Sequence, residues 1–432
     1  MASKLHLETA LLADGWRDNV AVGIDNGVIV SVGDAGREAA ERIPGISVPG
    51  LPNLHSHAFQ RAMAGLTERR GSGTDSFWTW REAMYGFVER LTPDDLEAIA
   101  ALAYLEMLEA GFTSVAEFHY LHHQPDGRPY DDPTEMSQRI VAAAQTVGIG
   151  LTLLPVLYRQ SGFLGQPPSP AQRRFLCDRD IYGRLMDTSV PGGTTGIAPH
   201  SLRAVTTEDL KWVAATWPDR PAHIHISEQT KEVDDCLAAH GRRPIELLFD
   251  TIDVGRRWHL IHATHADAGE IAQMAKAQAV VGLCPITEAN LGDGLFEVPS
   301  FLEQGGRFGV GSDSNVRISA ADELRTLEYG QRLIHRRRNV LGEEARSTGR
   351  RLFDSALLNT AIAPGQRADF VVLDGAGLRG DSVLDHWLFA ADNSAIRTVF
   401  CSGVPVVRDG RHVERERVRQ RYDIAFRRLQ SG

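Results

Sequence analysis

Two histidines separated by a single residue are the strongest chemical signal in the sequence. His55 and His57 lie at the end of a short apolar run that begins at Val48, which is typical of a buried strand. Side chains two positions apart in a strand point to the same side, so both imidazoles would face one point. Converging imidazole nitrogens are common zinc ligands. Such pairs are also frequent in ordinary proteins, so the prediction of a metal site depends on further ligands.

Three more candidates lie at the ends of other apolar runs. His225 ends the run 222–226, and we prefer it to His223, which shares its strand face but lies farther from the carboxyl end. We interpret His223 as a core or supporting histidine. His262 ends the sixth run and Asp313 follows the eighth. Three imidazoles and one carboxylate suit Zn²⁺ or Fe²⁺ and leave room for a water molecule.

The elements that must position these side chains are strand-length runs separated by helical patterns such as 94–110, 208–217 and 322–335. The runs are residues 48–54, 113–118, 150–157, 195–198, 222–226, 260–261, 279–283 and 308–311. This alternation predicts an α/β fold, a (β/α)₈ TIM barrel whose site is built at the carboxyl ends of its strands. A doubly wound sheet would need fewer strands and usually a glycine-rich phosphate turn, which we do not find.

The two ends of the chain have a different pattern, with short alternating strands and turn signals such as Asp25-Asn26-Gly27. We expect residues 1–47 and 359–432 to form one small discontinuous β-sandwich domain, with a C-terminal helix, beside a metal-dependent barrel of residues 48–358. Residues 65–90 make an unusually long connection after the first barrel strand. Insertions of this kind often form lids over barrel active sites.

Composition excludes several classes of function. The formal charge of −10 argues against a nucleic-acid partner, because phosphate binding needs clustered cations. The four cysteines are scattered and contain no CxxC pair, which is typical of a reduced, cytoplasmic protein. The N-terminus lacks the pattern of a signal peptide. Residues 140–158 carry no charge, but their glycines and proline indicate a helix end followed by a buried strand rather than a membrane span.

The pattern of HxH, then His225, His262 and Asp313, resembles the amidohydrolase superfamily over essentially the whole barrel. Members with two metals usually bridge them through a carboxylated lysine or a glutamate. None of the four lysines in this chain follows a predicted barrel strand, so we expect one metal. Glu228, three residues after His225, is similar to the glutamate of the mononuclear deaminase branch. Within that branch, residues 51–65, 117–120, 199–203 and 287–294 resemble the formimidoylglutamate deiminases of histidine degradation.

This resemblance implies hydrolysis of N-formimino-L-glutamate to N-formyl-L-glutamate and ammonia, by a protein that is a homodimer. The implied ligands of a single Zn²⁺, or Fe²⁺, are His55, His57, His225 and Asp313. Asp313 would also act as general base, Glu228 would protonate the formimino nitrogen, and His262 would hydrogen-bond the water or the oxyanion.

A substrate with two carboxylates calls for cationic partners in the pocket. Arg81, from the long connection, and Arg203, from the fourth βα loop, are the best candidates for bidentate contacts. Gln60, Tyr120 and His200 could complete the substrate pocket.

Three other interpretations remain open at this stage. A guanine or triazine deaminase of the same branch would act on flat, uncharged substrates, which paired arginines match poorly. A metal-free barrel used as a scaffold would require a degraded site, whereas every ligand position here is filled. A two-metal amidase would require the missing bridging lysine.

Overall fold

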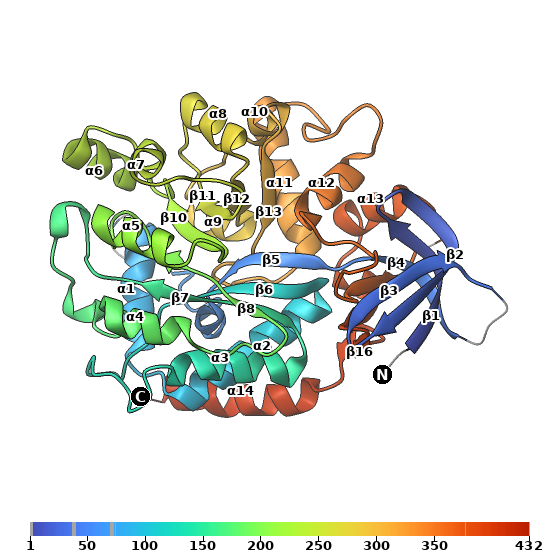
Figure 1. The fold of residues 1–432 in the computed structure, drawn as a ribbon, viewed down its shortest axis with the longest axis horizontal. Helices are drawn as coiled ribbons and strands as arrows, with labels where there is room; N and C mark the ends of the chain where they lie inside the picture. The colour runs from blue at the N-terminus through green and yellow to red at the C-terminus, as the bar shows by residue number, and fades with distance from the viewer. Residues whose placement is uncertain (1–2, 37–39, 70–72, 74, 376, 432) are drawn as a thin grey trace.

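The chain folds into a barrel of parallel strands with a separate β-sheet on one side (Figure 1). This computed structural model describes residues 3–36, 40–69, 73, 75–375 and 377–431. In Figure 1 the separate sheet lies at the right and contains blue and red strands, so both ends of the chain contribute to it. The predicted combination of a barrel and a discontinuous terminal β domain is confirmed.

The barrel wall is built from two groups of parallel strands. Within the described residues, its strands are β5 (Leu51–Ser56), β6 (Phe112–His119), β7 (Gly150–Leu157), β8 (Thr194–Thr195), β9 (Ala198–Pro199), β10 (Ala222–Ile226), β11 (Trp258–His262), β12 (Val280–Leu283) and β13 (Arg307–Val310). β5 to β9 form one group and β10 to β13 the other. Single parallel bridges, Ile197 to Ala222 and Ser56 to Asp313, join the groups at both seams. The second seam brings the first and last barrel strands together at the predicted site.

Helices surround the barrel in Figure 1 and cover the outer faces of its strands. The α-helices are α1 (Phe77–Val88), α2 (Pro93–Glu109), α3 (Glu135–Val147), α4 (Arg179–Met186), α5 (Thr207–Thr216), α6 (Thr230–His240), α7 (Pro244–Thr251), α8 (Ala268–Ala277), α9 (Pro285–Leu291), α10 (Val298–Glu303), α11 (Ala320–His335), α12 (Thr348–Leu357), α13 (Ser382–Phe389) and α14 (Arg415–Gln430). Short 3₁₀ helices are η1 (Ala58–Met63), η2 (Phe163–Gly165), η3 (Pro170–Gln172) and η4 (Asn393–Ala395).

The predicted helix starting near Pro93 is α2, and its first turn shows why it begins there. Pro93 occupies the first turn, and the Thr92 side chain accepts a hydrogen bond from the Asp95 backbone N–H. The C-terminal helix α14 packs on α2 and is tied to it by Arg421, which pairs with Glu97 at 2.8 Å, and by Arg428, which pairs with Asp95. The end of the chain therefore covers a helix close to its beginning.

The terminal β domain is one sheet in the order β17-β16-β15-β14-β4-β1-β2-β3. Its strands are β1 (Ser3–Leu12), β2 (Gly15–Asp25), β3 (Val28–Asp34), β4 (Glu41–Pro49), β14 (Phe370–Leu373), β15 (Ile396–Cys401), β16 (Val404–Arg408) and β17 (Arg411–His412). β4 joins the two halves, because it pairs in parallel with β1 and antiparallel with β14. The sheet has its own cluster of buried apolar side chains, which includes Leu7, Val22 and Phe370.

Two predicted strands differ from those observed. The run 48–54 is divided, since β4 ends at Pro49 and β5 begins at Leu51. Gly50 lies between them so close to Thr113 that a Cβ there would be 2.2 Å from its side chain. The run 195–198 is likewise broken into β8 and β9. Gly196 is the break, and a Cβ there would lie 2.7 Å from atoms of both Leu154 and Pro221. The exact domain boundaries at 47/48 and 358/359 stay a prediction.

Other expectations concern single segments. The charge-free stretch 140–158 contains the end of α3 and then β7, as interpreted from its sequence. Among the described residues, no helix has the length and apolarity needed to cross a membrane. The long connection 65–90 contains α1, although residues 70–72 and 74 of it lie outside the described residues. Its closure over a substrate stays a prediction.

Candidate metal centre and substrate pocket

The carboxyl ends of three barrel strands bring the four predicted ligands together. His55 lies on β5 and His57 directly follows it, His225 lies on β10, and Asp313 follows β13. The seam of the barrel positions Asp313: its N–H donates to the carbonyl of His55 at 2.9 Å, and the N–H of His57 donates to its carbonyl at 2.9 Å. The hydrogen bonds that close the barrel therefore also place the carboxylate beside the first two histidines.

Three imidazoles converge on one point. The Nε2 atom of His55 lies 3.2 Å from Nε2 of His57 and 2.9 Å from Nε2 of His225. On the opposite side of two of these rings, Nδ1 of His57 is 2.9 Å from the carbonyl of Phe118, and Nδ1 of His225 is 3.1 Å from the carbonyl of His200. Since a carbonyl only accepts, these Nδ1 atoms carry the protons and the Nε2 lone pairs point inward. Lone pairs this close repel one another unless a cation lies among them.

The electrostatics of the cluster fit a metal. Burial lowers the pKa of His57 to about 3 and holds the pKa values of His55 and His225 well below their usual range. The rings are therefore neutral, which is the form that binds metal. Asp313 Oδ1 is 3.3 Å from His57 Nε2, and burial raises the pKa of Asp313 to about 7. A cation held by the three imidazoles would lower that pKa again and keep the carboxylate charged.

Glu228 and His262 lie beside this cluster. Glu228 Oε1 is 3.7 Å from His262 Nε2, and the same nitrogen is 4.0 Å from Asp313 Oδ2. Burial lowers the pKa of His262, but the carboxylates of Glu228, Glu288 and Asp313 outweigh this effect and raise it to about 10. His262 therefore presents one nitrogen to two carboxylates that could exchange protons with a reacting group.

The backbone at this face of the barrel adopts conformations that non-glycine residues rarely take. Ser227 has φ 49°, His262 φ 69°, Ala263 φ 51°, Asp313 φ 42° and Asn315 φ 55°. Each such left-handed residue is sterically unfavourable for an L-amino acid and is held by its surroundings. Strain of this kind gathers at functional sites, where it aims side chains that a regular strand could not.

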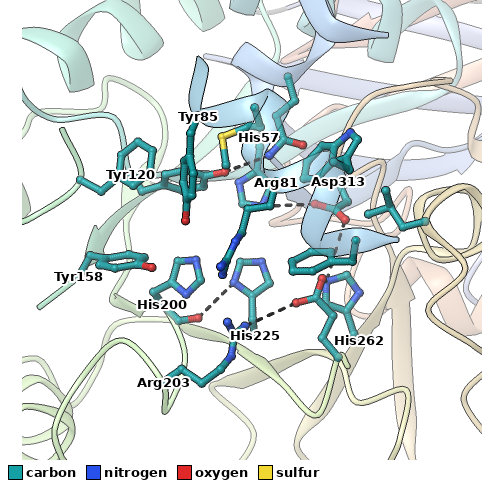
Figure 2. A pocket seen from close by; sticks show the side chains of 17 residues that line it. His57, Arg81, Tyr85, Tyr120, Tyr158, His200, Arg203, His225, His262 and Asp313 are labelled. Atoms are coloured by element: carbon teal, nitrogen blue, oxygen red, sulfur yellow. Dashed lines mark hydrogen bonds and ion pairs between the residues drawn. The ribbon is translucent and has the colours of Figure 1, made fainter. Parts of the chain in front are cut away.

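The predicted substrate residues line the same pocket as His57, His225, Glu228, His262 and Asp313. Figure 2 shows Tyr120, Tyr158 and His200 on one side of this pocket and Asp313 and His262 on the other. These predicted substrate residues are Gln60, Arg81, Tyr120, His200 and Arg203. The structure therefore brings together every residue predicted for the site; His55 is fully buried behind the pocket wall.

Polar contacts already hold several of these side chains in place. Gln60 Nε2 donates to the Tyr120 hydroxyl at 3.0 Å. The Arg203 guanidinium lies 3.9 Å from carboxylate oxygens of both Glu228 and Glu232. Arg81 extends from α1 with its guanidinium 4.5 Å from the centre of the Trp78 ring. Both cations therefore line the pocket that His57 and His225 of the imidazole cluster also line.

Several residues that line the pocket were not predicted from the sequence, among them Tyr85 and Tyr158. Tyr158 directly follows β7, so the rule that selected the metal ligands, proximity to the carboxyl end of a barrel strand, could have found it. Tyr85 lies four residues after Arg81 on α1, which places both on one helix face. His223, interpreted as a supporting histidine, stacks on His259 with ring centres 4.2 Å apart.

Comparison with known proteins identifies the fold and its family. The family model described as "Amidohydrolase family" matches residues 46–406. The chain belongs to the amidohydrolase family. A second model, "Formimidoylglutamate deiminase HutF, N-terminal domain", matches residues 2–42 of this amidohydrolase. The two matches correspond to the barrel with its flanking strands and to the first part of the terminal sheet.

Individual relatives cover nearly the whole amidohydrolase chain. Formimidoylglutamate deiminase from Pseudomonas aeruginosa is 52% identical, over 96% of this chain and 97% of its own. The crystal structure of an amidohydrolase from Brucella melitensis has a TM-score of 0.96 at 50% identity, covering 99% of this chain and 100% of its own. A zinc-containing atrazine chlorohydrolase variant from Arthrobacter aurescens has a TM-score of 0.81 at 20% identity, covering 98% and 99%. The last likeness concerns the fold alone.

Proposed function

We propose that this amidohydrolase hydrolyses N-formimino-L-glutamate to N-formyl-L-glutamate and ammonia. One observation carries the proposal: the pocket lined by His57 and His225, two of the three converging histidines, is also lined by Arg81 and Arg203. An uncharged heterocycle would bring no negative charge to either cation, whereas the two carboxylates of formiminoglutamate match them. The relative at 52% identity, a formimidoylglutamate deiminase, supports the same substrate.

The residues that would hold a single Zn²⁺-class cation are His55, His57, His225 and Asp313. Fe²⁺ would suit the same nitrogen and oxygen donors. When bound, such a cation supplies Lewis acidity and lowers the pKa of a water molecule toward neutrality. A second metal would need a bridging ligand such as a carboxylated lysine. The four lysines lie in β1, α5, α6 and α8, away from this cluster, which supports a single metal.

The acid–base steps belong to three side chains around the imidazole cluster. Asp313 accepts a proton from the attacking water as general base. Glu228 donates a proton to the formimino nitrogen, which makes the carbon more electrophilic and leaves an NH₂ group in the tetrahedral intermediate. The proton taken up by Asp313 then passes to this nitrogen, so that ammonia leaves, and the hydroxyl proton of the intermediate returns to Glu228. His262, 3.7 Å from Glu228, hydrogen-bonds the water and then the oxygen of the tetrahedral intermediate. The balance is HN=CH–NH–R plus H₂O giving O=CH–NH–R plus NH₃.

The two arginines of the pocket bind the glutamyl part of the substrate. Arg203, which is 8% exposed, would pair with one carboxylate and Arg81 with the other. Gln60, Tyr120 and His200 would donate further hydrogen bonds. The Gln60–Tyr120 contact fixes the direction of the phenol, which reduces the ordering that binding would require.

Product analysis tests this function directly. Purified protein loaded with Zn²⁺ should release ammonia from formiminoglutamate and leave N-formylglutamate, identified by mass. Glutamate and formamide would instead mean that the wrong C–N bond breaks and that the proton from Glu228 goes to the other nitrogen. Formimino-aspartate and formiminoglycine serve as shorter controls, and guanine as an uncharged one. Turnover of guanine with none of formiminoglutamate would refute the proposal.

A further inference from the structure

A buried carboxylate lies behind His262, on the side away from the pocket. Glu288 is on the short helix α9, and its Oε1 atom is 3.2 Å from Nδ1 of His262. The same oxygen accepts a hydrogen bond from the backbone N–H of Cys284 at 2.9 Å. The side chain is 2% exposed and is not among the described residues that line the pocket. Glu288 therefore contacts the site only indirectly, through its hydrogen bond with His262.

The contact determines which nitrogen of His262 faces the reaction. A carboxylate only accepts, so the hydrogen bond keeps a proton on Nδ1 whether or not the ring carries a second one. Nε2 is then left to face Glu228, at 3.7 Å, and Asp313, at 4.0 Å. Rotation of the ring would break the bond to Glu288 and turn Nε2 away from both carboxylates.

Glu288 is itself held in one orientation. The Cys284 N–H holds its carboxylate from the loop between β12 and α9, while His262 holds it from the end of β11. Neighbouring barrel strands thus carry the two partners of one carboxylate. An acceptor fixed in this way can orient an imidazole more strictly than the ring's own rotamer preference would.

We propose that Glu288 is a positioning residue, which holds the His262 ring and its Nδ1 proton so that Nε2 exchanges hydrogen bonds with the reacting water and oxyanion. The assignment rests on the deiminase function proposed above, because that reaction is how its effect is measured. Glu288 touches neither substrate nor reacting atoms, so it acts only through the imidazole. It should therefore affect turnover more than binding.

The chain offers a matched control residue. Glu323 on α11 is also fully buried, and it accepts a hydrogen bond from the Ile286 backbone N–H, on the same helix α9, at 2.9 Å. It makes no hydrogen bond or ion pair with a site histidine among the contacts of the described residues. Replacing Glu323 therefore removes a second buried carboxylate next to α9 while the hydrogen bond between Glu288 and His262 stays in place.

The first experiment compares Glu288→Gln and Glu288→Leu with Glu323→Gln and Glu323→Leu. Glu288→Leu should lower kcat for formiminoglutamate by about 10- to 100-fold, the usual effect of losing the partner of a functional imidazole. KM and metal content should stay within about twofold. Glu288→Gln should recover part of the loss, because its amide oxygen can still accept from Nδ1. The Glu323 variants should lower Tm but keep kcat within about threefold.

A double-mutant cycle with His262→Asn separates positioning from general destabilisation. If Glu288 acts through the imidazole, Glu288→Leu should change kcat less than about threefold in the His262→Asn background. Equal losses in both backgrounds, or a wild-type kcat in Glu288→Leu, would overturn the inference. An inactive wild type with full metal content would instead refute the deiminase function, and the two failures are therefore distinguishable.

Discussion

Replacing Arg203 by methionine tests how the pocket recognises a charged substrate. Arg203 is 8% exposed and carries its guanidinium 3.9 Å from both Glu228 and Glu232. Methionine keeps much of the apolar stem but removes the charge and the donors. The bound substrate would then bring a carboxylate into the pocket without its partner.

The geometry sets the size of the expected effect. Loss of one partner from a desolvated charge pair costs about 2–5 kcal/mol. The two glutamates already take part of the Arg203 charge in the free protein, so we expect the lower end of this range. About 2 kcal/mol corresponds to a fall in kcat/KM of about 30-fold. Metal content should not change, because the ion pairs of Arg203 are with Glu228 and Glu232 and not with the three converging imidazoles.

The assay compares formiminoglutamate with an uncharged formamidine on the same protein samples. Wild type should be slow on the formamidine, and Arg203→Met should change that rate less than about threefold. Arg159→Met is the matched control, because Arg159 pairs at 3.3 Å with Asp209 and does not line the pocket. Equal losses of Arg203→Met on both substrates would mean that Arg203 supports Glu228 rather than the substrate, which would refute this reasoning.

Three further predictions concern the metal, the acid and the pH dependence. His225→Ala should reduce bound metal from about one ion per chain to near zero and abolish ammonia release, as measured by metal analysis; a wild-type value near two would contradict a single site. Glu228→Gln should keep the metal but lower kcat by at least about 10²-fold, and normal turnover would leave Glu228 without an acid role. Burial lowers the pKa of His412, whose Nε2 donates to Val147 and whose Nδ1 accepts from the Glu414 N–H. Below about pH 6.5 His412 is protonated in the unfolded chain but stays neutral in the folded protein. The free energy of unfolding should therefore fall by up to about 1.4 kcal/mol per pH unit as pH decreases. Urea unfolding of His412→Gln should show a weaker pH dependence, and an unchanged slope would contradict the assignment.

The barrel and the grouping of its ligands could be predicted because both follow from local patterns. Runs of apolar residues predict strands, and the strand period decides that His55 and His57 face the same side. The carboxyl ends of parallel barrel strands meet at one face, so histidines and an aspartate at those ends had to be neighbours. The assignment of Glu228 and the arginines depended on family resemblance, because nothing in their spacing marks them.

Other features depend on contacts between distant segments and left no local signal. Gly50, at the break between β4 and β5, lies too close to Thr113 for a side chain to fit, and the two residues are far apart in the sequence. The contact of Glu288 with His262 joins α9 to β11. Residues 287–294 resemble a family segment, but this resemblance assigned no role to Glu288. The homodimer expected from the resemblance stays a prediction.

The shared sheet at the ends of the chain has a consequence for synthesis on the ribosome. When β4 leaves the ribosome, one of its edges can pair with β1. Its other edge has no partner until β14 is synthesised, and β14 begins only at Phe370. At about 5–20 residues per second, that edge stays open for on the order of tens of seconds. Asp313, the last of the proposed metal ligands, is made before the strand that closes the sheet. A nascent chain can therefore possess every proposed ligand while it still exposes a strand edge prone to pairing with other chains.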